Sequence, residues 1–277
     1  MIAALAFLLV GSGGTQLGSP IAQAATLSSG TPGFRMHMSM QITSSALGSP
    51  ITATGTGVVD LRDHASAMSL TMNLGDDSQV TQQLGSSAMR VDTILNGATA
   101  YVKLPAALTS SLGTSSRTWI KVDFAKLSGL PGLSSLADGP NTSDPSQTLQ
   151  MLHSVSGSVV NLGQQRVDGV ETTRYQATLS LARLADSLPS AERSLGRQVL
   201  STLQQAAPGD GFPVDVWIDA HHLVRRVVTS LDLSFPSGPN LQEVVQVDVS
   251  DYGPQSPPAT PPASEVFDAS GLAGAAG

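Results

Sequence analysis

A stretch of strict two-residue alternation constrains this chain most. In residues 34–42, one set of positions is apolar and the set between them is polar: Phe34, Met36, Met38, Met40 and Ile42 alternate with Arg35, His37, Ser39 and Gln41. Successive side chains of a β-strand point to opposite faces, so one face of such a strand would be apolar and the other polar. The pattern therefore predicts a half-buried strand.

Similar signals recur along the chain and predict about eleven strands. They fall at residues 34–42, 51–61, 65–73, 89–95, 98–104, 119–122, 157–164, 171–179, 214–218, 223–235 and 241–249. Asn96-Gly97 and Asp168-Gly169 are the dipeptides best suited to the positive φ of tight hairpin turns. Each is therefore expected to join two antiparallel neighbours.

Two segments between the strands predict helices. Residues 144–155 open with Asp144 as a cap candidate and Pro145 at the first helical position. Residues 181–207 carry leucines at helical spacing on both sides of Pro189, which should divide them into two helices. Helices inserted into a run of antiparallel strands indicate an α+β fold in which helices cover one face of the sheet.

The N-terminal residues 1–19 resemble a signal peptide. Residues 2–10 are continuously apolar but are about half as long as the ~20 residues that a membrane-crossing helix needs. Ala22-Gln23-Ala24 resembles a cleavage site, whereas Leu9-Val10-Gly11-Ser12 resembles a lipobox in which Ser12 stands where the lipidated cysteine would be. A thioether anchor needs sulfur, so this sequence as written could not carry one. A buried N-terminal helix is the third alternative.

At the other end, the compact domain is expected to end near Tyr252, which gives one domain over residues 20–252. Residues 253–262 are rich in proline, which lacks the amide donor that a helix or a strand ladder requires. The segment 253–277 continues beyond these prolines and finishes with a Gly/Ala-rich tail after Ser270. Val266-Phe267 is a short apolar pair within it that could return to the domain.

Charge and motif content argue against several classes of function. The chain has 14 Lys+Arg against 21 Asp+Glu, a net charge of −7, and no basic cluster, so no nucleic-acid partner is expected. It contains no cysteine. Adjacent residues of a strand point to opposite faces and cannot bind one metal ion, so we expect His221-His222 to lie in a turn. Asp63-His64 falls between two predicted strands and is expected to lie in a hairpin loop. Hydrolase, zinc-protease, Walker and EF-hand motifs are absent, and we predict neither an enzyme nor a cofactor.

The distinctive positive feature is methionine in the first strands. Met36, Met38, Met40, Met68 and Met72 fall on predicted strand faces, and the whole chain has only 11 aromatic residues, 2 Trp, 3 Tyr and 6 Phe. Methionine is unbranched and adaptable, so it suits either the filling of core gaps or a cavity for chains of varied shape. Core filling is the simpler interpretation, because apolar strand faces are normally packed.

An ordered set of short phrases resembles a known group of proteins. After an alanine-containing helical stretch at residues 20–27 and the strand at 34–40, the phrases are GVVDL (57–61), YVKLP (101–105), WIKVD (119–123), VDGVETTRY (167–175), PVDVWID (213–219) and LVRR (223–226). In this order and spacing they resemble the LolA/LppX-like superfamily, especially the actinobacterial LppX/LprG-type lipoproteins. The resemblance covers residues 20–252.

The resemblance implies a strongly curved antiparallel sheet, a half-open β-barrel whose concave face is covered by helices, with a hydrophobic cavity between the two layers. Proteins of this group bind acyl chains of lipids or lipoproteins and carry them outside the cytoplasmic membrane. No catalytic signature transfers with it. From strand alternation and helical spacing, we expect the cavity to be lined by Met36, Met38, Met40, Met68, Met72, Leu149 and Leu152.

The functional expectation is a non-enzymatic carrier of lipid or acyl chains, monomeric, exported to the cell envelope or secreted, with a membrane or cell-envelope transport partner. The alternative is a sensory or protein-interaction module of the RseB type, since that regulator is built on a similar fold. Cavity space distinguishes the two, because a carrier requires room for a hydrocarbon tail and an interaction module does not.

Overall fold

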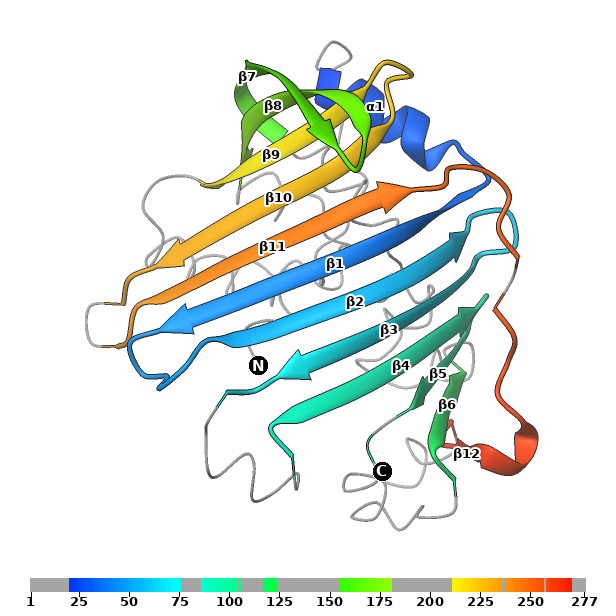
Figure 1. Ribbon diagram of the computed structural model, residues 1–277. Coiled ribbons are helices and arrows are strands. Elements are labelled where there is room, and N and C mark those ends of the chain that lie inside the picture. The colour runs from blue at the N-terminus through cyan, green and yellow to red at the C-terminus, as the bar shows by residue number, and fades with distance from the viewer. Residues whose placement is uncertain are drawn as a thin grey trace.

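The computed structural model describes residues 20–75, 86–103, 105, 117–123, 155–180, 211–235, 238–256 and 258–270. Figure 1 shows one broad sheet with a single α-helix, α1, beside it in this part of the chain. The elements are α1 (Pro20–Ser29), β1 (Gly33–Ser44), β2 (Ile51–Asp60), β3 (Ala65–Asn73), β4 (Ala88–Asn96), β5 (Thr99–Lys103), β6 (Trp119–Asp123), β7 (Val155–Val167), β8 (Val170–Ser180), β9 (Gly211–Asp219), β10 (Val224–Leu233), β11 (Leu241–Ser250), the 3-10 turn η4 (Ala263–Glu265) and β12 (Val266–Asp268).

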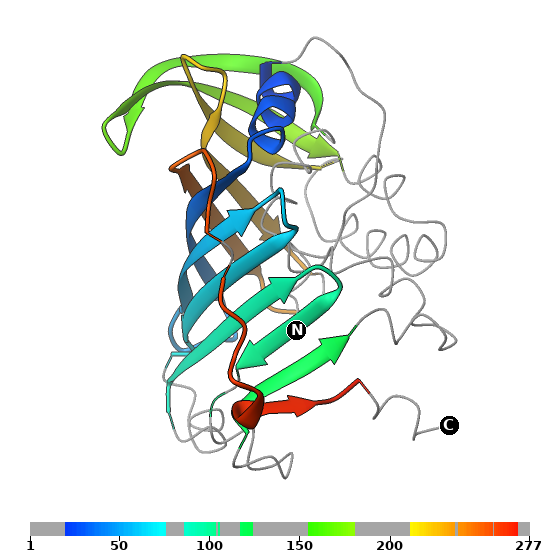
Figure 2. The ribbon, with the colours of Figure 1, turned by 90° about the vertical axis from the view of Figure 1, so that its right-hand side faces the viewer.

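The sheet consists of two antiparallel meanders joined in the middle. Its strand order is β12-β6-β5-β4-β3-β2-β1-β11-β10-β9-β8-β7, so the first and the eleventh strands of the chain lie side by side. The β1–β11 pairing is antiparallel and extends over ten residue pairs, from Arg35↔Ser250 to Ser44↔Leu241. Because β12 and β7 are the two ends of this order, the sheet is open. Figure 2 shows that it bends strongly, with α1 on the inner side.

Hairpin turns form where the sequence predicts them. Gly97 has φ +55°, and Asp168 and Gly169 have φ +48° and +84°, so Gly97 and both residues of the second dipeptide adopt the left-handed conformation that tight antiparallel turns favour. Asp63-His64 and His221-His222 also lie in turns rather than in strands. All eleven predicted strands are present, and their ends shift by no more than a few residues.

The helix α1 forms because its apolar residues recur at helical spacing and Pro20 occupies its first position. Ile21, Ala24 and Ala25 are fully buried and belong to the same core cluster as the methionines of β1. The helix ends at Ser29, and the amide of Gly30 donates to the carbonyl of Thr26. None of the helices among the described residues is long and apolar enough to cross a membrane.

The apolar pair Val266-Phe267 returns to the sheet, where it pairs with β6 in parallel as part of β12. One feature differs from the sequence expectations. Val155, expected to end a helix, begins β7 instead. Residues 144–154 and 181–207, which carry the other predicted helices, lie outside the described residues, so a covering of the concave face by these helices stays a prediction.

Candidate functional site

The inner face of the sheet is a continuous apolar surface, and methionine dominates its centre. On β1, Met36, Met38 and Met40 are 4%, 2% and 7% exposed. The register places Val249, Val247 and Val245 of β11 directly opposite them. Opposite residues of antiparallel strands point to the same face, so these two rows form one surface. The alternation seen in the sequence therefore identified the buried face correctly.

A strip of small residues lies beside the methionine row. On β2, the positions opposite Met40, Met38 and Met36 are Ala53, Gly55 and Gly57. We call these three residues the small-residue strip. On its other side, β3 places Met72, Leu70 and Met68 opposite the same three positions. The strip is therefore bordered on both sides by long, flexible side chains.

Side chains of the two bordering rows extend over the glycines of the strip. A Cβ placed on Gly57 would lie 3.0 Å from Cγ of Met36 and 3.3 Å from the carbonyl oxygen of Ala67. One placed on Gly55 would lie 3.0 Å from the carbonyl oxygen of Ser69, 3.1 Å from Cδ1 of Leu70 and 3.4 Å from Cε of Met68. The space above the two glycines is thus bordered by methionine and leucine side chains as well as by backbone atoms. Such side chains can change rotamer at low cost, so this part of the face is adaptable.

The structure brings most of the predicted site residues together. Met36, Met38 and Met40 are buried, and Met68 and Met72 are partly buried and packed against the same cluster. Leu149 and Leu152 lie outside the described residues. Sequence reasoning missed the small-residue strip, because only the pairing of β1, β2 and β3 places its members opposite methionines. That these side chains contact a ligand is a proposal, developed below.

One acidic side chain lies on this apolar face. Glu243 of β11 is 3% exposed, and the register places Ile42 of β1 and Leu231 of β10 opposite it. Burial raises the pKa of Glu243 to about 7. The sequence already marks Glu243 as unusual, because it occupies a position where every second residue of the strand is otherwise apolar. The apolar residues of this alternation are Leu241, Val245, Val247 and Val249. A charged residue at an apolar position of such a strand is the kind of exception that marks a site.

The outer face of the sheet is polar and is organised around Trp217. This ring is 7% exposed, and the guanidinium carbons of Arg174 and Arg226 lie 5.0 and 6.0 Å from its centroid. Arg174 pairs with Asp215 at 3.0 Å, and Arg226 pairs with Asp248. Paired charges and a covered indole thus satisfy one another in this cluster.

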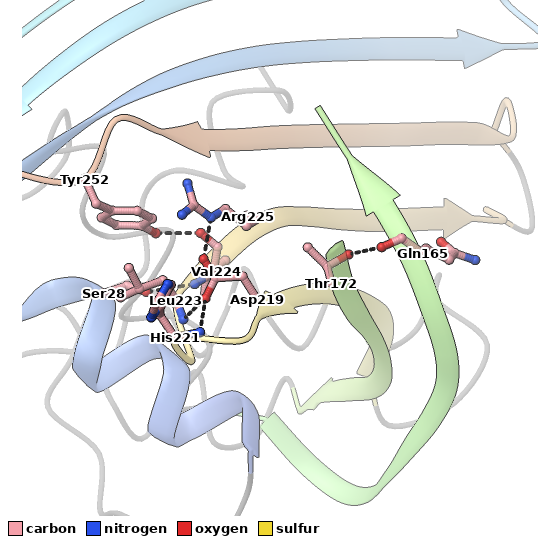
Figure 3. A network of polar contacts seen from close by, with 9 residues as sticks. All are labelled: Ser28, Gln165, Thr172, Asp219, His221, Leu223, Val224, Arg225 and Tyr252. Carbon is pink, nitrogen blue, oxygen red and sulfur yellow. Dashed lines mark hydrogen bonds and ion pairs between the residues drawn. The ribbon is translucent and has the colours of Figure 1, made fainter. Parts of the chain in front are cut away.

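A second polar network joins α1 to the sheet (Figure 3). One oxygen of Asp219 accepts hydrogen bonds from the amides of His221 and Leu223, both at 2.9 Å, and the other lies 2.7 Å from Nε of Arg225. The Ser28 hydroxyl of α1 accepts a bond from the amide of Val224 at 2.9 Å, and the Tyr252 hydroxyl donates to the carbonyl of Val224 at 2.6 Å. Burial raises the pKa of Tyr252 above its usual value.

This network has a structural role. Its groups satisfy one another, and the carboxylate of Asp219 organises the turn that contains both histidines. His222 adopts a left-handed φ of +59° there. Among the described residues, no group of three or more histidines and carboxylates is placed to hold a metal ion. The polar network therefore fixes α1 against the β9–β10 hairpin and leaves the apolar face as the candidate site.

No protein-family model matches the sequence. A Streptomyces griseus protein described as an uncharacterized 31.2 kDa protein in the rplA-rplJ intergenic region is 26% identical over 173 residues, which cover 61% of this chain and 53% of the relative. The chain thus spans about half the length of that curated relative.

Several solved structures are similar to this chain over most of their length. The lipoprotein LppX of Mycobacterium tuberculosis is 16% identical, with 86% of this chain and 94% of that chain covered, at a TM-score of 0.43. LprF of Mycobacterium bovis is 13% identical, with 92% and 99% covered, at 0.44. A LolA superfamily protein of Nitrosomonas europaea is 10% identical, with 88% and 96% covered, at 0.32. These are the kinds of protein that the sequence phrases resemble, but likenesses with TM-scores below 0.5 assign no ligand to this chain.

Proposed function

We propose that this protein binds the acyl chain of a lipid on the inner face of its sheet and carries it outside the cytoplasmic membrane, without catalysing a reaction. The observation that supports this proposal most is the small-residue strip, Ala53, Gly55 and Gly57, between two rows of flexible side chains. The sequence resemblance to the LolA/LppX-like superfamily and the names of the structures described above agree with it.

The physical argument rests on adaptability. A strand face that served only as core would gain most from branched side chains that interlock, whereas glycine gives up packing and weakens a strand. Here the space above the glycines is bounded by carbonyl oxygens of β3 and by methionine and leucine side chains, and the side chains can change rotamer. An acyl chain lying along the strip would then replace side-chain contacts with its own. Each CH₂ group removed from water contributes about 0.8 kcal/mol, so a long chain would bind tightly.

The first experiment asks whether any lipid binds. Native mass spectrometry of the protein purified from cells should show adducts with lipid masses, and the delipidated protein should bind a fluorescent fatty acid that unlabelled lipid displaces. A clean apoprotein mass together with no binding of the fluorescent probe would refute the proposal.

The second experiment locates the site. Gly57→Leu places a branched side chain in the strip, and we expect at least tenfold weaker binding of the fluorescent probe. Thr56→Leu is the matched control, because Thr56 is the neighbouring residue on β2 and is exposed on the opposite face. Gly57→Ala serves as a milder variant, whose Cβ would meet chiefly the Met36 side chain. Equal binding by folded Gly57→Leu and Thr56→Leu would exclude the strip as the site.

One observation favours the interaction-module alternative. Val160 and Leu162 lie on β7, which is at one end of the strand order, and they are 48% and 42% exposed. Exposed apolar residues on an edge strand suit contact with another protein. A pull-down with membrane proteins that is unaffected by lipid extraction, and is lost in a Val160→Ser/Leu162→Ser variant, would support this alternative.

A further inference from the structure

Glu243 stands out among the residues of the apolar face because its carboxylate is buried without an evident structural purpose. In the part of the chain that the structure describes, its Oε1 atom has no hydrogen-bond partner. The other buried carboxylates among the described residues, Asp60 and Asp219, each accept hydrogen bonds from two backbone amides, which makes Glu243 the exception. A buried carboxyl oxygen without a donor is costly, so its presence needs a reason.

Among the described residues, the strand positions next to Glu243 on this face offer no counter-charge. The same face of β1 carries Phe34, three methionines, Ile42 and Ser44, and that of β11 carries Leu241 and three valines. On β10 the residues of this face after the bulge are Val227, Thr229, Leu231 and Leu233. None of these side chains is charged. Burial accordingly raises the pKa of Glu243 to about 7.

Its position along the strands is also informative. Glu243 pairs with Ile42, two residues from the end of β1, whereas α1 leads into the other end of that strand. Figure 1 shows α1 and the start of β11 at opposite ends of the sheet. From Ile42 to Met36 the strand rises by about 20 Å, at roughly 3.3 Å per residue. A chain that lies along the methionine row and the small-residue strip would thus have one end close to Glu243.

We propose that Glu243 accepts a hydrogen bond from a hydroxyl group in the head of an uncharged lipid, whose acyl chain lies along the methionine row toward α1. This inference rests on the proposed function and specifies its ligand class. A hydroxyl supplies the missing donor, whereas the carboxylate of a free fatty acid or a phosphate would place a second negative charge beside the first. The site therefore selects hydroxyl-bearing neutral lipids over anionic ones.

The test compares three ligands with similar chains: monopalmitoylglycerol, methyl palmitate and palmitate, each displacing the fluorescent probe from delipidated protein at pH 8. Monopalmitoylglycerol carries hydroxyl donors and methyl palmitate carries none, so the ratio of their dissociation constants reports the head-group contact. We expect Glu243→Leu to reduce this preference at least tenfold, because hydrogen bonds to charged groups are worth about 1.5–3 kcal/mol and about 1.4 kcal/mol corresponds to tenfold. Binding of methyl palmitate should stay within about twofold, since it makes no such bond.

Two further variants keep the comparison interpretable. Glu265→Leu makes the same substitution at an exposed glutamate of η4 and should leave the preference unchanged. Glu243→Gln keeps an acceptor oxygen of similar shape and should retain part of the preference, which provides a readout if Glu243→Leu does not fold.

The outcomes separate this inference from the proposed function. If both neutral lipids bind the wild-type protein and their ratio is the same in Glu243→Leu, the head-group inference is wrong and the proposed function stands. Tighter binding of palmitate than of monopalmitoylglycerol by the wild-type protein would also overturn the inference. If none of the three ligands binds the wild-type protein, the proposed function fails and the inference fails with it.

Discussion

The burial of Glu243 makes the stability of the protein depend on pH in a defined direction. Its carboxyl has an ordinary pKa of 4.5 when exposed and a pKa of about 7 in the folded protein, where burial disfavours the charged form. Between these two values the folded state holds a proton that the unfolded chain has released. Raising the pH from about 4.5 to 7 therefore destabilises the folded state, and above pH 7 this contribution is constant.

The size of the effect follows from the shift. One pKa unit corresponds to about 1.4 kcal/mol, so the difference between the two pKa values amounts to about 3 kcal/mol. Gln does not titrate in this range. The free energy of unfolding of Glu243→Gln, relative to the wild-type protein, should thus rise by about 3 kcal/mol between pH 4 and pH 8.

Urea unfolding of delipidated protein at a series of pH values measures this difference directly, because groups common to both proteins cancel. Glu265→Gln is the control, since Glu265 is exposed, and its difference from the wild-type protein should change little with pH. A difference between Glu243→Gln and wild type that is the same at pH 4 and pH 8 would show that Glu243 does not lie in an apolar environment.

Two further predictions concern the network that fixes α1. Asp219→Ala leaves Arg225 without its partner and two amides without their acceptor, and should lower the free energy of unfolding by about 3–5 kcal/mol in urea titrations; a loss below about 1 kcal/mol would show that water replaces these contacts. Tyr252→Phe removes the bond to the carbonyl of Val224 and the contact of the hydroxyl with Ser28 but leaves no charge unpaired, so a smaller loss of about 1 kcal/mol is expected in the same assay. A Tyr252→Phe loss as large as that of Asp219→Ala would contradict the assignment of the main role to the carboxylate.

The strands were predictable because their signals are local. Alternation in residues 34–42 and the Asn96-Gly97 turn each depend on a few neighbouring residues, and β3 spans the predicted residues 65–73. The parallel pairing of β12 with β6 was not predictable, because it joins segments separated by well over a hundred residues. The pairing of β1 with β11, which brings the two halves of the chain together, likewise has no local signature.

The candidate site was predictable in part for the same reason. Alternation placed Met36, Met38 and Met40 on a buried face, but it could not show what lies beside them. Gly55 and Gly57 were visible in the sequence as interruptions of a strand pattern, and their meaning depends on the cross-strand register that places them opposite methionines. In the sequence, Glu243 stands out only as a charged residue at an otherwise apolar position of its strand. That apolar residues of β1 and β10 lie opposite it is known only from the strand pairing.

Photocrosslinking with a palmitate analogue that carries a diazirine in its chain, on delipidated protein and with peptide mapping, tests the central claim most directly. Trypsin cleaves after Arg35 and Arg62, so a single peptide, residues 36–62, contains both the methionine row and the small-residue strip. We predict that this peptide carries the main label and that unlabelled monopalmitoylglycerol suppresses it. Because each strand carries side chains of both faces, fragmentation of this peptide must place the label on residues of the methionine row or the small-residue strip rather than on outward-facing residues such as His37 and Thr56. Labelling confined to outward-facing residues, or labelling that no unlabelled lipid suppresses, would contradict the claim that the inner face holds an acyl chain.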